Sequence, residues 1–379
     1  MKNLLYNLSL FFLLCSCSTQ QNDSATLLHV ALDKATEDIR TSSFLDTTYC
    51  QPIVLEQTQY PIGEISKIQY VNGLFFIMDK HGQKLFSFDE KGECNLLLDK
   101  LGKSSREYVE MRDFYVCDSS IYILDYPAQK ILVYDINGMY KKTIKMNDIS
   151  GNFIFADSNS IYIVNEYSDT PKGKFHLFKT DLNGNYISAM IPFDELGQFS
   201  DGCYTRCGNM FIYGGRPDNI LYSLTDNCSK SFLTFDFGEK SMPKELYSLN
   251  DLELLEKGID EKYIRGVNGY FGNSRYLFLE FLNEEFDKYH AIYDFNTHKI
   301  ESIGKDIYCD FKYYAPSNKN VVSDHYMYSI VECDYFVMWS DNAIQYSPFI
   351  SLDYKKKLET LKNKVESNGN PVIFKYKFK

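Results

Sequence analysis

The chain has 379 residues and a formal net charge of −11, which disfavours binding to the phosphate backbone of nucleic acids. Its aromatic residues are 31 Tyr and 28 Phe with a single Trp, a composition that suits the pleated, half-buried strands of a β-protein. Beyond the N-terminus no stretch reaches about 18 uninterrupted apolar residues, so the sequence predicts no transmembrane helix.

Residues 1–17 have the pattern of a bacterial lipoprotein signal peptide. Lys2 gives a positive start, residues 4–14 are largely apolar, and the segment is too short to span a bilayer. Residues 14–17 resemble a lipobox, so we expect Cys17 to become the lipidated first residue; ordinary secretion with cleavage nearby is the alternative. Ser18, rather than Asp, follows Cys17, which favours anchoring in the outer membrane. Residues 18–27 predict a flexible tether.

Residues 28–379 could form two domains by length alone, but an internal repeat indicates one. Residues 74–92 and 120–138 share an apolar run, an Asp, a polar turn, a second apolar run and a closing Asp-x-x-Gly. Asp89 and Asp135 are 46 residues apart (135 − 89), and Asp181 follows after another 46 (181 − 135). This pattern predicts β-hairpins, and about four short strands every 40 to 50 residues are typical of propeller blades.

The fold class that we predict is therefore all-β, a six-bladed β-propeller of four-stranded antiparallel blades with short helical insertions. The predicted blades are residues 64–98, 110–147, 150–193, 201–237, 265–304 and 311–339 with a completing strand. Residues 51–56 and 371–378 offer strands that can complete the sixth blade and close the ring, which would otherwise expose a sheet edge. Residues 371–378 alternate apolar and basic side chains and predict an edge strand.

Two segments have helical rather than strand periodicity. Residues 250–257 lie between the fourth and fifth blades and end at Gly258, and residues 352–366 place Leu358, Leu361 and Val365 on one helical face. We expect both helices on one rim of the disc, as packing caps rather than as partner-binding elements.

Eight cysteines follow the signal peptide, and no Cys-x-x-Cys pair indicates a zinc or redox site. Cys203 and Cys207 are four residues apart, about 13 Å in an extended strand, which is too far for a disulfide. We expect buried free thiols, although an exported protein could form disulfides.

The recurring aspartates invite comparison with a calcium site, but repeated positions in a ring lie one blade apart and do not converge. We expect them to bind turn backbones instead. The set comprises Asp79, Asp89, Asp125, Asp135, Asp181, Asp226 and Asp294. The histidines have no metal-binding spacing, and no phosphate loop or nucleophile elbow occurs. We predict no metal and no cofactor, with a divalent ion on the propeller axis left open.

The segments that lead into the innermost strands are the best candidates for a binding site, because those strands line the central channel. They combine Arg, Tyr and Glu, and Arg and Tyr commonly anchor binding surfaces. They are also compatible with ordinary solvated loops. The candidate ligand-binding residues at the channel mouth are Lys103, Arg106, Glu107, Tyr108, Tyr204, Arg206, Arg265, Tyr313 and Tyr314.

These features resemble a known family, the six-bladed β-propeller lipoproteins of Bacteroides-type bacteria, which are related to NHL-repeat propellers. The segments that carry the resemblance are residues 29–35, 52–56, 62–65, 101–108 and 370–379. Ser104 and Ser105 occupy positions where the family usually has Gly-Pro. The resemblance implies the propeller fold and export, and little about activity.

Our leading hypothesis is a non-catalytic, monomeric propeller, anchored by lipid in the cell envelope, that binds an unknown ligand or envelope protein. A metal-dependent hydrolase or lyase of the lactonase type is the first alternative. It would need carboxylates from several inner strands around one ion, and the candidates are Glu64, Asp113, Asp157 and Asp310. A structural subunit of an envelope assembly is the second alternative.

Overall fold

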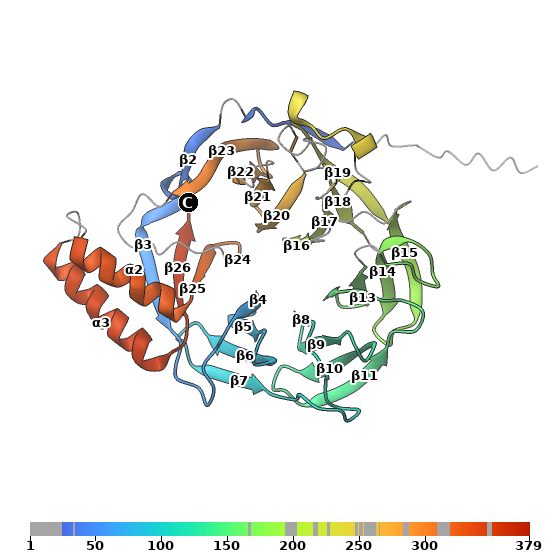
Figure 1. Ribbon diagram of the computed structural model, residues 1–379, viewed down its shortest axis with the longest axis horizontal. Coiled ribbons are helices and arrows are strands. Elements are labelled where there is room, and N and C mark those ends of the chain that lie inside the picture. Colours follow the sequence, from blue (N-terminus) through green and yellow to red (C-terminus); the bar gives the residue numbers. More distant parts are fainter. Residues whose placement is uncertain are drawn as a thin grey trace, which may run out of the picture.

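The computed structural model describes residues 25–32, 35–165, 168–193, 203–214, 219–225, 228–246, 249, 253, 263–264, 266–282, 288–308, 319–346 and 351–379. Six sheets of four or five strands surround a central opening, each sheet forming one blade of a propeller (Figure 1). The predicted fold class, a six-bladed β-propeller of mostly four-stranded antiparallel blades, is confirmed.

The first three blades are each built from four consecutive antiparallel strands, with the earliest strand innermost. The strands are β4 (Ile65–Val71), β5 (Leu74–Asp79), β6 (Lys84–Asp89) and β7 (Cys94–Leu98) in blade one; β8 (Asp113–Cys117), β9 (Ser120–Asp125), β10 (Lys130–Asp135) and β11 (Tyr140–Lys145) in blade two; and β12 (Phe153–Ala156), β13 (Ser160–Val164), β14 (Phe175–Asp181) and β15 (Tyr186–Pro192) in blade three.

Blades four and five follow the same plan and each gain a fifth, outer strand from the N-terminal segment. Their consecutive strands are β16 (Cys203–Cys207), β17 (Met210–Gly214), β18 (Ile220–Leu224) and β19 (Ser229–Asp236), then β20 (Val267–Gly272), β21 (Tyr276–Leu282), β22 (Lys288–Asp294) and β23 (Lys299–Tyr308). Strand β1 (Thr26–His29) pairs in parallel with β19, and β2 (Thr36–Arg40) pairs in parallel with β23. Short 3-10 helices are η2 (Thr41–Ser43), η3 (Gly238–Lys240) and η4 (Lys244–Leu246).

The sixth blade combines strands from both ends of the chain. Its order is β24 (Asn320–Val322), β25 (Tyr326–Val331), β26 (Val372–Phe378) and β3 (Leu45–Val54). The prediction that residues 371–378 form an edge strand is wrong, because β3 covers the outer side of β26. The alternation of apolar and basic residues in this strand is typical of an edge, but Lys375 is only 8% exposed and has a carboxylate partner, as described below.

The recurring aspartates that the structure describes bind turn backbones, as predicted, whereas Asp226 lies outside the described residues. Asp89, Asp135 and Asp181 each accept, through Oδ1, the backbone N–H groups two and four residues later, at 2.8–3.0 Å. The glycine three residues after each aspartate has φ between +80° and +88°, a conformation that glycine adopts without a steric penalty. These local hydrogen bonds end the third strand of each of blades one to three and fix the register of the fourth.

Apolar side chains fill the space between neighbouring blades and account for most of the aromatic content. Phe155 of blade three, for example, lies 4.6 Å from the Tyr162 ring in its own blade and 4.9 Å from the Phe211 ring in blade four. Among the cysteines whose side chains the structure describes, none forms a disulfide: Cys50, Cys94, Cys117, Cys207, Cys228 and Cys333. The expectation that these thiols are buried holds for Cys117 and Cys207 and is wrong for Cys228, which is exposed.

Two helices, α2 (Cys333–Tyr346) and α3 (Leu352–Asn368), lie outside the ring beside the sixth blade (Figure 1). The helix expected at residues 352–366 is confirmed. Leu358 and Val365 are buried, Ser351 caps the first turn, and Gly369 ends the helix with φ 66°. The described helices include none that is long and apolar enough to cross a bilayer. The helix expected at residues 250–257 falls almost entirely outside the described residues.

The prediction that the sixth blade extends to residue 339 is wrong, because residues 334–339 form the first half of α2 and not a strand. Phe336, Trp339 and Ala343 recur at intervals of three and four and pack into the core of the sixth blade. The Phe336 ring lies 5.7 Å from the ring of Phe374 on β26. The helix thus uses aromatic residues, which individually favour strands, to cover the sheet.

Candidate functional site

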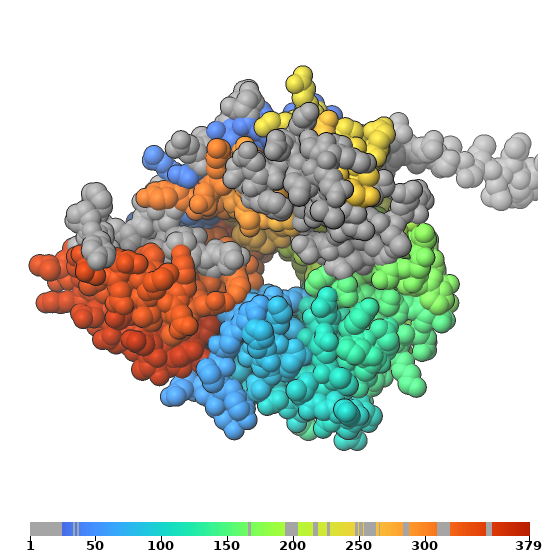
Figure 2. All heavy atoms as spheres, viewed as in Figure 1, coloured from blue at the N-terminus to red at the C-terminus, as the bar shows by residue number. Residues whose placement is uncertain are grey.

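The innermost strands of all six blades, β4, β8, β12, β16, β20 and β24, line a central channel with a volume of about 860 Å³. The opening is visible at the centre of the disc (Figure 2). Because every blade contributes to its wall, the channel is the place where side chains from distant parts of the sequence converge.

A partly buried polar network on this wall joins four blades. The ammonium group of Lys67 on β4 donates to Asp113 Oδ1 and to the carbonyl of Phe114 on β8, both at 2.7 Å, and to the hydroxyl of Tyr204 on β16. The Tyr204 hydroxyl donates to the carbonyl of Ile154 on β12 at 2.7 Å. The other Asp113 oxygen accepts the N–H of Ile154 at 2.8 Å. All three N–H donors of Lys67 are therefore used within the protein.

The environment of this network opposes charge, and the hydrogen bonds compensate for that cost. Burial lowers the pKa of Lys67, and the nearby Asp113 carboxylate counteracts this shift. Burial likewise raises the pKa of Asp113, and Lys67 counteracts it. Burial, reinforced by Asp113, raises the pKa of Tyr204 well above its ordinary value. We infer that the network holds the ring together and offers no free acid or base for catalysis.

The spacing of residues in the repeat could have predicted part of this network. Lys67 and Asp113 are 46 residues apart, which is one repeat, so they occupy equivalent places on adjacent innermost strands. The Gln69 side chain joins the same two strands by donating to the Val116 carbonyl and accepting the Val116 N–H, both at 2.8 Å. Polar residues one repeat apart on successive inner strands would have identified the contact of Lys67 with Asp113, whereas the partners of Gln69 are backbone groups and leave no such signal.

Among the predicted site residues, Tyr204 and Arg206 line the channel, and both lie within strand β16 rather than in the loop before it. Arg206 is exposed near the end of that strand. Its Nε donates to the carbonyl of Gly208 at 3.1 Å, and its guanidinium lies 5.4 Å from the ring of Phe211. Arg206 also interacts with Tyr115, whose pKa is raised mainly by burial. An arginine and two tyrosines thus meet on one side of the channel.

Lys103, Arg106 and Glu107 lie elsewhere, on the segment between β7 and β8. They do not line the channel. The Arg106 guanidinium lies 5.4 Å from the Tyr140 ring, and Glu107 accepts the N–H of Ser104 at 2.9 Å. Since this segment leads into an innermost strand and Arg206 lies where one ends, the two groups occupy opposite faces of the disc.

Tyr108 is fully buried at the end of the same segment. Its hydroxyl donates to the carbonyl of Gln83 at 2.8 Å and accepts the N–H of Lys100 at 3.1 Å. Burial raises its pKa strongly. Tyr108 therefore fastens the segment between blades one and two to blade one. Arg265, Tyr313 and Tyr314 lie outside the described residues, and so does Cys17.

The carboxylates named for the enzyme alternative do not converge where the structure describes them. Glu64 pairs at the surface with Lys80 at 3.1 Å and His81 at 2.7 Å. Asp113 belongs to the Lys67 network, and Asp157 accepts turn N–H groups at 2.7 and 2.8 Å. Asp310 lies outside the described residues. Within the described part of the chain, no three His, Cys, Asp or Glu side chains form a group that could hold a metal ion.

Comparison with known proteins identifies a family and confirms the fold. A family described as "Domain of unknown function (DUF4934)" matches residues 32–377. A solved structure from Bacteroides fragilis, named "Putative exported protein", is 17% identical, with 93% of this chain and 100% of that chain covered and a TM-score of 0.73. A Bacteroides vulgatus member of the DUF4221 family is 11% identical, with 87% and 96% covered and a TM-score of 0.50. A search of curated proteins finds no match.

Proposed function

The chain belongs to the DUF4934 family, and we propose that its propeller is a non-catalytic binding module held to the bacterial envelope by a lipid on Cys17. In this proposal a polar ligand or a segment of a partner protein enters the central channel. A rigid ring with one shared channel suits recognition, because six blades can present side chains to the same object. A similar Bacteroides structure is named as an exported protein, which agrees with an envelope location.

The observation that carries the proposal is the position of Arg206 in the channel. All three N–H donors of the neighbouring cation, Lys67, form hydrogen bonds within the protein. Arg206 is exposed and has Tyr115 beside it. A guanidinium presents five donors in a fixed plane; the Nε of Arg206 donates to Gly208, and the side chain also interacts with the Tyr115 hydroxyl. Arginine with tyrosine is a common anchor pair at binding surfaces.

Thermal unfolding of the intact chain in the presence of a panel of sugars, nucleotides, amino acids and short peptides tests this proposal. We expect at least one class to raise the melting temperature of the wild type, and Arg206→Ala to remove that shift. Lys103→Ala, outside the channel, is the matched control and should keep it. A shift that survives Arg206→Ala and disappears with Lys103→Ala would contradict the proposal, as would chemical conversion of the bound compound detected by mass spectrometry.

The lipid anchor is tested separately. Cells fed a labelled fatty acid should transfer the label to the wild-type chain, and Cys17→Ser should abolish labelling while Cys15→Ser leaves it unchanged. Equal labelling of the wild type and Cys17→Ser would show that Cys17 is not the acceptor.

A further inference from the structure

A second cavity lies between blades five and six, with a volume of about 710 Å³. It is bounded by β20, β21, β22 and β23 of blade five, by β24 and β25 of blade six, and by the start of α2. It adjoins the channel, since Tyr270, Phe271 and Asn320 line both, but Arg206 is not among its lining residues. Its volume is in the range that accommodates a small organic ligand.

The floor of this cavity is apolar and aromatic. Phe44, Phe278, Met327 and Val331 line it and are each only 2–3% exposed. Phe271 stacks on Phe278 with ring centroids 4.8 Å apart. Tight packing leaves few voids of this size in protein interiors. A floor of this kind suits an apolar, flat ligand group.

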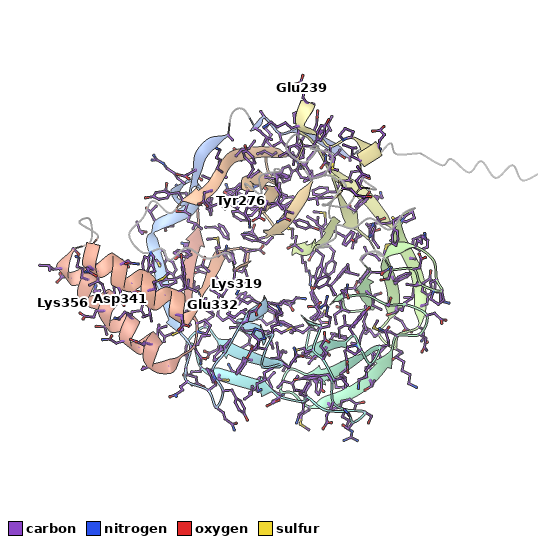
Figure 3. All side chains as sticks on the ribbon, in the orientation of Figure 1. Glu239, Tyr276, Lys319, Glu332, Asp341 and Lys356 are labelled. Atoms are coloured by element: carbon purple, nitrogen blue, oxygen red, sulfur yellow. The ribbon has the colours of Figure 1, made fainter. Side chains whose placement is uncertain are left out.

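Ionised side chains surround the apolar floor. Lys319 bonds to Glu332 where α2 begins, and Figure 3 shows the two side chains close together there. Lys288 pairs with Glu280 at 3.2 Å. These four charges cancel in pairs. The remaining acid on the rim is Asp306. Its Oδ1 accepts the N–H of Ile307 at 2.7 Å, and among the residues that the structure describes it forms no ion pair with a lysine or arginine.

Asp306 lies near a histidine that faces the same cavity. His290 pairs across the sheet with Glu280 on one side and with Gly304 on the other, and Asp306 is two residues beyond Gly304. Burial lowers the pKa of His290 and Lys288 adds to this shift, while Glu280 and Asp306 act in the opposite sense. A neutral imidazole can accept a hydrogen bond, and Asp306 supplies negative charge. The open corner of the cavity is therefore suited to a cation.

We propose that this cavity binds a small amphipathic cation, with an apolar or aromatic body on the phenylalanine floor and an ammonium or guanidinium group at Asp306 and His290. The overall charge of −11 favours the approach of such a ligand.

Isothermal titration of the intact chain with 4-phenylbutylamine, 4-phenylbutanol and 4-phenylbutyrate tests the proposal, because the three probes share one body and differ in charge. We expect the amine to bind about tenfold more tightly than the alcohol, the usual gain from one charge-assisted hydrogen bond, and the acid to bind most weakly. Equal binding of all three probes, strongest binding of the acid, or no binding of the amine at millimolar concentration would overturn the proposal.

Two substitutions locate the site. A Cβ at Gly269, which lines the cavity, would meet only the Cβ of Glu280 at 3.9 Å, so Gly269→Leu should fill the cavity without a backbone clash and abolish binding of every probe. Asp306→Asn should remove most of the advantage of the amine and leave alcohol binding unchanged. Glu301→Gln, an exposed carboxylate on the same strand but outside the cavity, is the control and should change nothing.

Amine binding that survives Gly269→Leu, or an amine advantage that survives Asp306→Asn, would place the cation elsewhere and refute the assignment. If Gly269→Leu does not fold, the titration of Asp306→Asn with the amine and the alcohol is sufficient to test the site. Arg206→Ala should leave these titrations unchanged, which separates failure here from failure of the proposed channel function.

Discussion

Lys375, on the last strand of the chain, is joined to Glu90 of the first blade, 285 residues earlier, by hydrogen bonds of 3.0 Å to both carboxylate oxygens. The Lys375 ammonium also lies 4.1 Å from the centre of the Tyr326 ring. The hydroxyls of Tyr70 and Tyr328 each donate to Glu90 Oε1 at 2.7 Å. This cluster connects the sixth blade to the first, where the ring closes.

Replacing Glu90 by glutamine should weaken ring closure. Glutamine keeps an acceptor oxygen but leaves the buried Lys375 charge without its counter-ion. We expect the free energy of unfolding to fall by about 2 kcal/mol. This loss is smaller than for a fully buried ion pair because 39% of the Glu90 side chain is exposed. Urea unfolding measures this loss. Glu93→Gln, on the same turn but outside the cluster, should cost less than about 0.5 kcal/mol, and equal losses would refute the role of Glu90.

The contribution of Glu90 should depend on pH. Burial alone would raise the pKa of Glu90, but hydrogen bonds from Tyr70, Tyr328 and Lys375 outweigh it, and the pKa lies below the ordinary 4.5. A carboxyl group with a lowered pKa in the folded state stabilises the fold above its unfolded pKa and loses that effect as pH falls through the folded pKa. The stability gap between the wild type and Glu90→Gln should therefore be constant near neutral pH and shrink below about pH 4. Urea midpoints measured from pH 7 to pH 3 check this, and a gap that persists at pH 3 would contradict it.

Breaking the channel network should destabilise the whole ring. Lys67→Met leaves Asp113, which is 2% exposed, without its cation, and we expect a loss of about 3–5 kcal/mol. The double variant Lys67→Met with Asp113→Leu removes both charges and should recover much of that loss. A double-mutant cycle by chemical denaturation measures the coupling. If the losses of the single variants simply add, the pair is not energetically connected.

Helix α2 offers a matched test of its packing against blade six. Phe336 is fully buried, so Phe336→Ala should cost about 3–5 kcal/mol through the cavity that it leaves. Met338, two residues later, is 55% exposed, and Met338→Ala should stay within about 0.5 kcal/mol. Thermal or urea unfolding compares the two variants. Similar losses would mean that the helix does not use Phe336 to hold the sheet.

The blades could be predicted because their turn chemistry is local. Asp89, two backbone N–H groups and Gly92 make a complete turn within four or five residues, so the repeat is visible without any long-range information. The same reasoning failed for residues 334–339, which were assigned to the sixth blade but form a helix. A short aromatic run fits a strand as well as a buried helix face. Burial of Phe336 against Phe374, nearly forty residues later, decides between them.

The candidate site was harder to predict, because the type of a residue specifies neither the direction in which its side chain points nor the face of the disc on which it lies. Tyr108 and Tyr204 look alike in sequence, yet one fastens a connecting segment to blade one and the other lines the channel. Arg206 was assigned to a loop entering an inner strand, whereas it belongs to the far end of that strand. The cavity between blades five and six depends on how two sheets diverge, and no local pattern in either sheet encodes it.

Strands β1, β2 and β3 come from the first part of the chain but complete the last three blades. A chain that emerges N-terminus first, from a ribosome or an export channel, therefore presents three strands whose partners have not yet appeared. Blades one to three are built only from their own consecutive strands and can form as they emerge, whereas β3 must wait for β26. Assembly should thus be sequential in its first half and cooperative at its end, with release of the C-terminus as the event that permits the final fold.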